Sequence, residues 1–452
     1  METTNPICYH QHMTNSKLST QPYKGARDFY PEDMRTENYI FDTWRKVCKL
    51  YGFEEYSFPI LEPLEIFSAK TGEEIVNNQL FSFEDKGGRK LAIRPELTPG
   101  TVRMLAQKYN ALPQPMKWFM IGSNWRYEKP QLGRGREFNQ LEANIFGDKT
   151  EMADFEIFQL VISIMKAFGA TEKMFEIKLS DRRLVSCLLT DVLKLKPEII
   201  DKTRRMMDKR SKVSAENFAL TLKDYGLDTK QIELIEIFLS GTLEELSKTI
   251  PQKLLEQNEG YQTIKRLFTL FKQNNMAQYL RFDPAVIRGF DYSDGLVYEL
   301  FDKNPINKRS IFGGERFDKL IGIFGDFDLP ATGFAMGDYT LYEFLKGWNL
   351  LPKLNQTDTY FVTLWPTDED NKFLNASLEI SQTLRNKGKE VFSWLTPNTK
   401  LEKQLRYADK KNYSCVIIIG QDELKNSTVT VKNLQSQKQE TKSIESFIKE
   451  LE

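Results

Sequence analysis

Residues 125–147, which read WRYEKPQLGRGREFNQLEANIFG, carry cations, carboxylates, an aromatic ring and amides at regular spacing. Successive side chains of a β-strand point to opposite faces, so Arg126 and Glu128 are expected to share one face of the first half. By the same alternation, one face of the second half carries Phe138, Gln140, Glu142 and Asn144. The stretch therefore predicts an antiparallel hairpin with a chemically mixed face and a polar connecting loop.

This face suits a ligand that combines a phosphate group with an aromatic ring. Arginine binds phosphate through paired N–H groups, and Phe138 offers a surface for stacking. The loop adds three cations, Lys129, Arg134 and Arg136. The alternative is a solvated hairpin whose charges form surface salt bridges, and the residues alone leave both interpretations open.

A second stretch, IRGFDYSDGLVYE (residues 287–299), places Arg288 between an apolar run and an Asp-Gly turn. A fixed cation at that position is able to neutralise negative charge on a ligand. The alternative is an ion pair with Asp291 or Glu299 inside a hairpin.

The chain has only two histidines, His10 and His12, and both lie in a polar segment. A Ser-His-Asp triad, a Cys-His pair and a zinc site built on histidines are therefore not expected. Carboxylates, arginines and Mg²⁺ remain to carry out any chemistry. The cysteines have no CxxC spacing, which is typical of reduced thiols in the cytoplasm: Cys8, Cys48, Cys187 and Cys415.

A length of 452 residues predicts two or three domains. A content of 40% hydrophobic and 12% aromatic residues indicates a folded, globular protein. Basic and acidic residues number 63 each, so net charge neither favours nor excludes a polyanionic partner. No run approaches the roughly 18 apolar residues of a membrane span, so no membrane partner is expected.

Hydrophobic periodicity predicts the elements that position these residues. In the first part of the chain we expect a helix over 32–51, a short strand around Pro59, the hairpin over 117–147, a helix over 150–168, a helical block over 183–276, strands over 285–301 and 310–312, and an apolar helix over 337–347. The helical block interrupts a mixed antiparallel sheet, which indicates an insertion. After Pro352, strands alternate with helices, which predicts a small α/β domain with parallel strands and right-handed crossovers. The predicted class is α+β.

Several segments also resemble a known family. The hairpin is similar to motif 2 of class II aminoacyl-tRNA synthetases, and Pro59 after the long helix resembles motif 1, the dimer-interface element. KGARDFYPEDM, AIRPELTPGTVRML, RGFDY and FGGERFDKL resemble signature segments of histidyl-tRNA synthetases, in the family's order. LEKQLRYADKKNYSCVIIIGQDELKNSTVTVK is similar to the family's anticodon-binding domain. The resemblance runs from about residue 23 to 448.

The resemblance implies a domain organisation. It consists of a flexible arm over 1–22, a class II catalytic domain over 23–350 with a helical insertion over about 183–276, and an anticodon-binding domain over 356–452. It also implies a cytoplasmic homodimer that binds histidine, ATP with Mg²⁺, and histidine tRNA.

The resemblance further implies roles for single residues. Arg126 would bind the α-phosphate of ATP, Glu128 would lie near the adenine, Phe138 would stack on it, and Arg134 would reach the β- and γ-phosphates. The substrate's α-ammonium would be held by Glu96, Thr98 and Gln140. Arg288 would contact both the α-phosphate and the amino-acid carboxylate as a catalytic cation beside Arg126, and Tyr292 would contribute to histidine binding.

Four positions depart from the family pattern. Asn144 stands where an acidic residue is common, and Ser293 and Phe317 stand where tyrosines are common. Because those groups usually read the imidazole ring, Asn144 and Ser293 are candidate ring contacts. Thr340 in ATGFAMGDYTLYEFL replaces the motif 3 arginine. Arg134, Arg136 and Mg²⁺ are the candidates to take over its charge, and the alternative is impaired ATP binding.

The implied activity is that of a histidine–tRNA ligase, which forms histidyl-adenylate and transfers it to the 3′ end of histidine tRNA. One alternative is a catalytically silent paralogue that regulates another enzyme, as the synthetase-like subunit of ATP phosphoribosyltransferase does. The other is a tRNA-binding module without activity. The basic run DKTRRMMDKRSK (201–212) is a candidate RNA contact or, alternatively, a solvated helix face.

Overall fold

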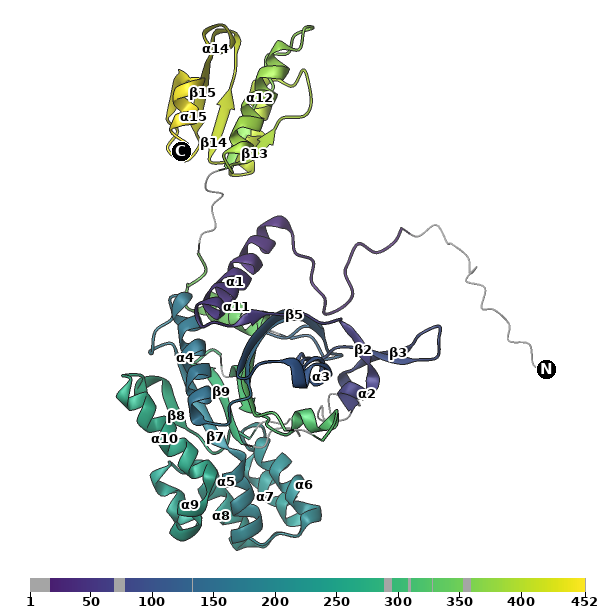
Figure 1. The fold of residues 1–452 in the computed structure, drawn as a ribbon, viewed down its shortest axis with the longest axis vertical. Helices are drawn as coiled ribbons and strands as arrows, with labels where there is room; N and C mark the ends of the chain where they lie inside the picture. The colour runs from purple at the N-terminus through teal and green to yellow at the C-terminus, as the bar shows by residue number, and fades with distance from the viewer. Residues whose placement is uncertain are drawn as a thin grey trace, which may run out of the picture. The chain divides into compact units, whose positions relative to one another are not determined.

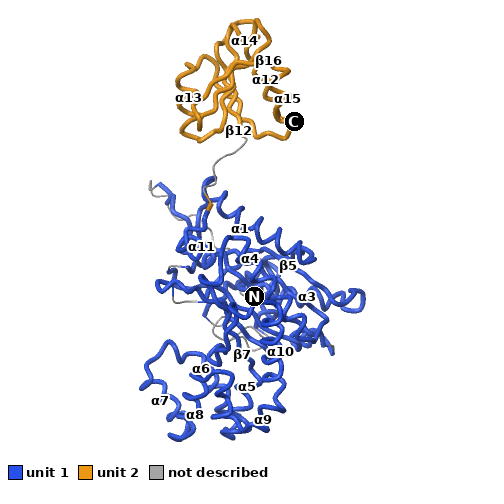
Figure 2. Tube along the Cα trace, turned by 90° about the vertical axis from the view of Figure 1, so that its left-hand side faces the viewer, with its two compact units in different colours: residues 1–351 blue, residues 352–452 orange. Residues whose placement is uncertain are grey.

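The computed structural model describes residues 17–68, 78–131, 133–287, 295–307, 310–326, 328–352 and 359–451. The chain divides into two compact units, Met1–Leu351 and Pro352–Glu452 (Figure 2). The predicted boundary between residues 350 and 356 lies close to this division, and the predicted domain assignment stays a proposal.

An eight-stranded sheet with the order β1-β5-β6-β11-β10-β9-β7-β8 forms the centre of the first unit. Its strands are β1 (Glu54–Glu55), β5 (Met116–Trp125), β6 (Glu137–Phe146), β7 (Phe175–Asp181), β8 (Leu280–Phe282), β9 (Leu296–Asp302), β10 (Ser310–Arg316) and β11 (Ala331–Gly337). The pairs β1–β5 and β7–β8 at the two edges are parallel, and the pairs between them are antiparallel. The expected mixed, mainly antiparallel sheet of an α+β protein is confirmed.

Helices pack against this sheet, and a small second sheet lies in the same unit. Those outside the predicted insertion are α1 (Pro31–Leu50), α2 (Leu64–Ser68), α3 (Thr98–Gln107), α4 (Glu151–Ala167) and α11 (Asp338–Gly347), with 3₁₀ turns η2 (Tyr109–Ala111), η6 (Ala277–Tyr279) and η7 (Leu320–Ile323). Helix α1 has Pro31 at its first position, where the missing N–H costs nothing. Its apolar stripe, which includes Ile40, Trp44 and Val47, is buried in the core shared with α4. A small antiparallel sheet, β2 (Leu61–Pro63), β4 (Lys90–Ile93) and β3 (Phe81–Glu84), completes this part.

The expected helical block is present and gathers beside strands β7 and β8 (Figure 1). It consists of α5 (Arg182–Cys187), η3 (Leu188–Val192), α6 (Pro197–Asp208), η4 (Arg210–Lys212), α7 (Ala215–Asp224), α8 (Thr229–Ser240), η5 (Glu244–Lys248), α9 (Gln252–Gln257) and α10 (Glu259–Gln273). Its buried side chains, such as Phe218 and Phe271, belong to the same hydrophobic cluster as the large sheet.

The second unit is a five-stranded sheet with the order β13-β12-β14-β15-β16. Its elements are β12 (Thr359–Val362), α12 (Lys372–Asn386), β13 (Glu390–Ser393), α13 (Leu401–Lys410), β14 (Cys415–Ile418), α14 (Gln421–Asn426), β15 (Thr428–Asn433), β16 (Gln439–Ser443) and α15 (Ile444–Lys449). The expected parallel pairing is correct for β12 with β13 and β14. It is wrong for β15, which pairs antiparallel with β14 because only the short helix α14 separates the two strands. Strand β16 was not expected, and it pairs antiparallel with β15.

Other differences from the predicted elements have local causes. The strand expected around Pro59 is divided into β1 and β2, since proline lacks the N–H that a ladder needs. Strand β11 was not expected, because its sequence ATGFAMG is rich in glycine and alanine, and pairing with β6 and β10 on both sides holds it in place. The strand expected over 285–301 is observed from Leu296 onward, and residues 288–294 lie outside the described residues. No helix among the described residues is long and apolar enough to cross a membrane.

Candidate active site

One cavity of about 140 Å³ gathers several of the side chains that the sequence singled out. Five predicted site residues line it: Glu96, Thr98, Arg126, Gln140 and Asn144. They come from the segment that leads into α3 and the first residue of that helix, from the residue that follows β5, and from the face of β6 that alternation predicts. The structure therefore brings together residues that are up to 48 positions apart in the sequence.

Small residues form the floor of this cavity across three neighbouring strands. In the sheet register Ala335 lies beside Glu142 and Gly313 beside Ala335, while Gly333 lies beside Asn144. Because these positions carry a methyl group or a hydrogen, the polar side chains of β6 stand above an open stretch of sheet.

Gly333 is a position where the structure leaves no room for a side chain. A Cβ atom there would lie 1.8 Å from Asn144 Oδ1 and 2.5 Å from the backbone oxygen of Ala143. Such contacts are shorter than real Cβ atoms make, and the Ala143 oxygen belongs to the paired strand. The glycine is thus required by the close approach of Asn144.

Glu142 is the centre of a buried polar network, although the sequence pattern predicted only its place on the shared face of the strand. Its Oε1 accepts hydrogen bonds from Thr101 Oγ1 at 3.0 Å, Asn144 Nδ2 at 3.0 Å and Tyr56 Oη at 3.3 Å. Its Oε2 accepts one from Thr98 Oγ1 at 2.7 Å. The Thr98 hydroxyl, expected at the substrate's ammonium, is thus directed to Glu142.

Burial raises the pKa of Glu142 from 4.5 to about 7, although hydrogen bonds from Thr98 and Thr101 oppose the rise. A carboxyl group of this kind stabilises the fold fully below its unfolded pKa, and the contribution is lost as the pH rises through the folded pKa. The relevant window therefore runs from about pH 4.5 to pH 7.

The variant Glu142→Gln is expected to gain stability relative to the wild type as the pH rises from about 5 to about 8, because glutamine cannot ionise. The expected gain is roughly 2 kcal/mol in the free energy of unfolding, and other groups cancel in the comparison. Unfolding of both ligand-free proteins at the two pH values measures this difference. A difference that does not change with pH would contradict it.

Arg126 is fixed at one end of the cavity. Its Nε donates to the backbone oxygen of Pro95 at 2.9 Å, which ties it to the segment that carries Glu96. Its guanidinium carbon lies 5.3 Å from the centroid of the Phe138 ring. The predicted phosphate-binding cation and the predicted stacking ring are therefore neighbours.

The hairpin loop holds the next group of predicted residues. Glu128 and Arg134 form an ion pair, with Oε2 and Nη1 3.0 Å apart, and the Arg134 side chain is about half exposed. The Arg136 guanidinium lies 3.9 Å from the centroid of the Tyr127 ring, and its Nε donates to the Glu128 backbone oxygen. Arg134 thus remains accessible to a ligand, whereas Arg136 contributes to the conformation of the loop.

Thr340, in the first turn of α11, makes a structural contact where the family pattern has an arginine. Its Oγ1 donates to the backbone oxygen of Ile311 at 2.6 Å. The hairpin loop approaches it closely, since a Cβ atom on Gly133 would lie 3.8 Å from Thr340 Cγ2. Arg134, one of the cations expected to replace the missing arginine, therefore lies in the loop segment beside Thr340.

Three predicted residues, Arg288, Tyr292 and Ser293, lie outside the described residues, so their roles stay predictions. Phe317 lines the cavity, with its ring 6.3 Å from that of Phe146. Glu315 also lines it and was not selected from the sequence. Alternation along β10 would have placed Glu315 on the face of Gly313, but the predicted strand ended at residue 312.

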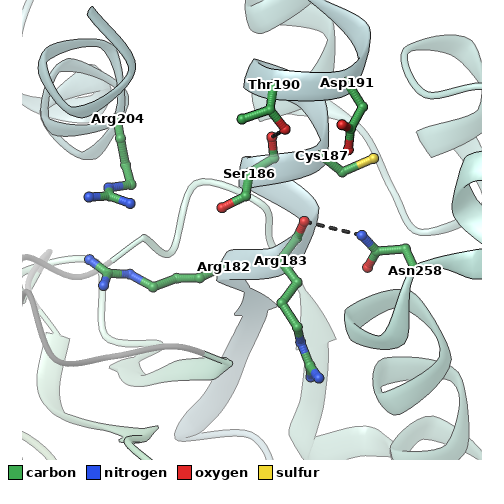
Figure 3. Close-up of a pocket in the computed structure, with 8 residues that line it drawn as sticks. All are labelled: Arg182, Arg183, Ser186, Cys187, Thr190, Asp191, Arg204 and Asn258. Atoms are coloured by element: carbon green, nitrogen blue, oxygen red, sulfur yellow. Dashed lines mark hydrogen bonds between the residues drawn. The ribbon is translucent and has the colours of Figure 1, made fainter. Parts of the chain in front are cut away.

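A second cavity, of about 320 Å³, opens beside α5 and α6 (Figure 3). Two of its arginines have acidic partners: Arg183 with Asp181 and Glu259, and Arg204 with Asp201. Figure 3 shows the Arg183 side chain directed away from Arg182 and Arg204. Burial raises the pKa of the Cys187 thiol to about 11, so this thiol stays protonated near neutral pH. This cavity contains none of the residues selected for catalysis.

Comparisons with known proteins show the family to which the chain belongs. The family model described as histidyl-tRNA synthetase matches residues 25–340, and the model of an anticodon binding domain matches residues 361–452. A histidine–tRNA ligase of Leptospira biflexa is 40% identical over 440 residues, which cover 97% of this chain and 99% of the relative. One of Haloarcula marismortui is 35% identical, with 94% and 96% covered.

Solved structures show the same fold. The crystal structure of histidyl-tRNA synthetase from Nostoc sp. PCC 7120 superposes with a TM-score of 0.79 at 23% identity, over 96% of this chain and 99% of that one. An ATP phosphoribosyltransferase regulatory subunit/histidyl-tRNA synthetase from Bacillus halodurans gives 0.71 at 22% identity, over 87% and 97%. Likeness of fold alone thus does not separate enzymes from regulatory relatives.

Proposed function

The chain belongs to the histidyl-tRNA synthetase family, and from this premise we propose that the cavity over β6, β10 and β11 is where it activates histidine. The protein is an aminoacyl-tRNA ligase. Histidine and ATP give histidyl-adenylate and pyrophosphate, and the histidyl group then passes to the 3′-terminal adenosine of histidine tRNA. The observation that carries the proposal is the convergence of Arg126, Glu96 and Gln140 on one cavity.

Arg126 is the group that lowers the barrier to adenylate formation. The histidine carboxylate and the α-phosphate both carry negative charge, and the pentacoordinate phosphorus gathers more as the carboxylate attacks. A cation held in place by Pro95 and the β5–β6 hairpin meets this charge without reorganisation. Arg288 is proposed as the second such cation, on its sequence alone.

The remaining roles follow from chemical complementarity. Glu96 and Gln140 hold the α-ammonium, because a carboxylate and an amide oxygen are suited to its N–H donors. Phe138 stacks on the adenine beside Arg126. Arg134 reaches the outer phosphates from the loop that lies next to Thr340.

Mg²⁺ is proposed to enter with ATP. Magnesium usually coordinates substrate phosphates and takes few ligands from the protein, so ATP itself can carry the ion into the site. When bound, the ion would neutralise the phosphates.

The second unit is proposed to read the anticodon, and the insertion to contact RNA. In residues 201–212, Arg204 and Arg210 have acidic partners, whereas the side chains of Lys202, Lys209 and Lys212 are exposed. Exposed lysines of this kind can contact phosphates of a nucleic acid.

A cytoplasmic homodimer is proposed as the working form. Ile60 and Leu61, which adjoin the motif 1 proline, are each 41% exposed, as expected of an apolar contact surface. Cys48, Cys187 and Cys415 are free thiols, which fits a reducing compartment. A monomer in analytical ultracentrifugation would contradict the dimer.

ATP–pyrophosphate exchange with each of the twenty amino acids tests the activity. We expect exchange with histidine and with no other amino acid, followed by charging of histidine tRNA. Absence of exchange with every amino acid would favour a tRNA-binding module without activity, the rival to which the threonine at position 340 points, or a silent regulatory paralogue.

A further inference from the structure

Five carboxyl and amide side chains line the cavity, three of them on β6, and only some of the five have an assigned partner on the substrate. Arg126 and Phe138 mark the end of β6 at which ATP binds. Gln140, Glu142 and Asn144 follow at two-residue steps of about 7 Å along the strand. The substrate's carboxylate must face ATP, so its side chain extends toward Glu142 and Asn144.

The hydrogen bonds of Glu142 leave it one direction for a ligand. Among the residues that the structure describes, Oε1 accepts from three donors, whereas Oε2 accepts only from Thr98. A carboxylate oxygen has two lone pairs, so Oε2 can accept another N–H. Glu142 itself is 1% exposed and lines the cavity.

Asn144 is placed where it supports ligand binding by Glu142. Its Nδ2 donates to Glu142 Oε1, and within the described parts of the chain its Oδ1 receives no hydrogen bond. Asn144 Oδ1 can occupy its position because Gly333 has no side chain. Oε2 and Oδ1 are thus two acceptors at the end of the cavity that faces away from ATP.

We propose that Glu142, oriented by Asn144, is the residue that recognises the N–H group of the substrate's imidazole ring. This inference rests on the proposed function of the cavity. The Glu142 carboxylate accepts the hydrogen bond from the ring N–H. It lies two residues before Asn144, on the same face of the same strand. A buried acceptor of this kind rejects a ligand without the N–H, because the acceptor would then be left without its partner.

The test compares two ligands that differ only in the ring. L-Histidine has a ring N–H, whereas L-β-(thiazol-4-yl)alanine has sulfur in its place and the same ammonium and carboxylate. Calorimetry gives the dissociation constants of both for the wild type and for Glu142→Gln. The ratio of the two constants reports on ring recognition and does not depend on the fraction of protein that is folded.

We expect the wild type to prefer histidine strongly, and Glu142→Gln to lower that preference about tenfold or more, because the ring N–H loses a charge-assisted partner. The matched control is Glu62→Gln, which removes another buried carboxylate, 5% exposed and paired with Arg103 outside the cavity. Its preference should equal that of the wild type.

Two results would overturn the inference while leaving the proposed function intact. If both ligands lose affinity equally in Glu142→Gln, the carboxylate acts on the ammonium that they share. If neither loses affinity, Glu142 is only structural. A wild type that shows neither histidine binding nor histidine-dependent exchange would instead contradict the function of the cavity, and with it the inference.

Discussion

Arg126→Ala is expected to lower histidine-dependent pyrophosphate exchange by roughly a thousandfold or more. The guanidinium is anchored to the Pro95 backbone oxygen and lies beside the Phe138 ring, so it meets the charge that develops at the α-phosphate without having to move. Because the interaction strengthens in the transition state, the loss should appear in kcat more than in KM for histidine. Steady-state exchange kinetics measure both constants.

Two further variants serve as comparisons for the loss of exchange expected in Arg126→Ala. Arg126→Lys keeps the charge but loses the paired N–H geometry, so it should recover only part of the rate. Arg134→Ala removes a loop cation that is 54% exposed and paired with Glu128, and its effect should be smaller and fall mainly on KM for ATP. Exchange by Arg126→Ala at close to the wild-type rate would show that another cation performs this role.

Asp154→Asn is expected to destabilise the first unit by about 3 kcal/mol, as is typical when one partner of a buried ion pair is removed. Arg316 is 6% exposed, and its Nη2 lies 2.8 Å from Asp154 Oδ2. Burial raises the pKa of Asp154, and the charge of Arg316 opposes that rise. In the variant, the Arg316 charge would be left buried with Asp318 and two backbone oxygens as its partners.

The Asp154–Arg316 ion pair also lies next to the cavity, so its loss should affect ligand binding as well as stability. Arg316 follows Glu315 and precedes Phe317, both of which line the cavity, so histidine binding should weaken together with stability. Asp318→Asn is the matched control: Asp318 is 32% exposed and lies 3.2 Å from the same guanidinium, so its loss should cost less than about 1 kcal/mol. The midpoint of urea unfolding measures both variants, and equal midpoints for Asp154→Asn and the wild type would contradict the expectation.

The sequence by itself determined the hairpin and its chemistry. Alternation of side chains is a local property of a strand, so the shared face of Gln140, Glu142 and Asn144 could be predicted without knowing which strand lies beside it. The helices α1, α4 and α11 were predicted for the same reason, since an amphipathic period is set by neighbours in the chain. The family, and with it the expected reaction, followed from ordered motifs.

Only the tertiary structure decided how the site is completed. Strand β11 has weak strand propensity and exists because β6 and β10 pair with it, so the open floor at Gly333 was not predictable from local pattern. The sequence left Glu142 without a role, because burial raises its pKa and its four hydrogen bonds come from Tyr56, Thr98, Thr101 and Asn144, up to 86 residues away. Burial and contacts between distant segments depend on how the whole chain packs, and no single stretch of sequence carries that information.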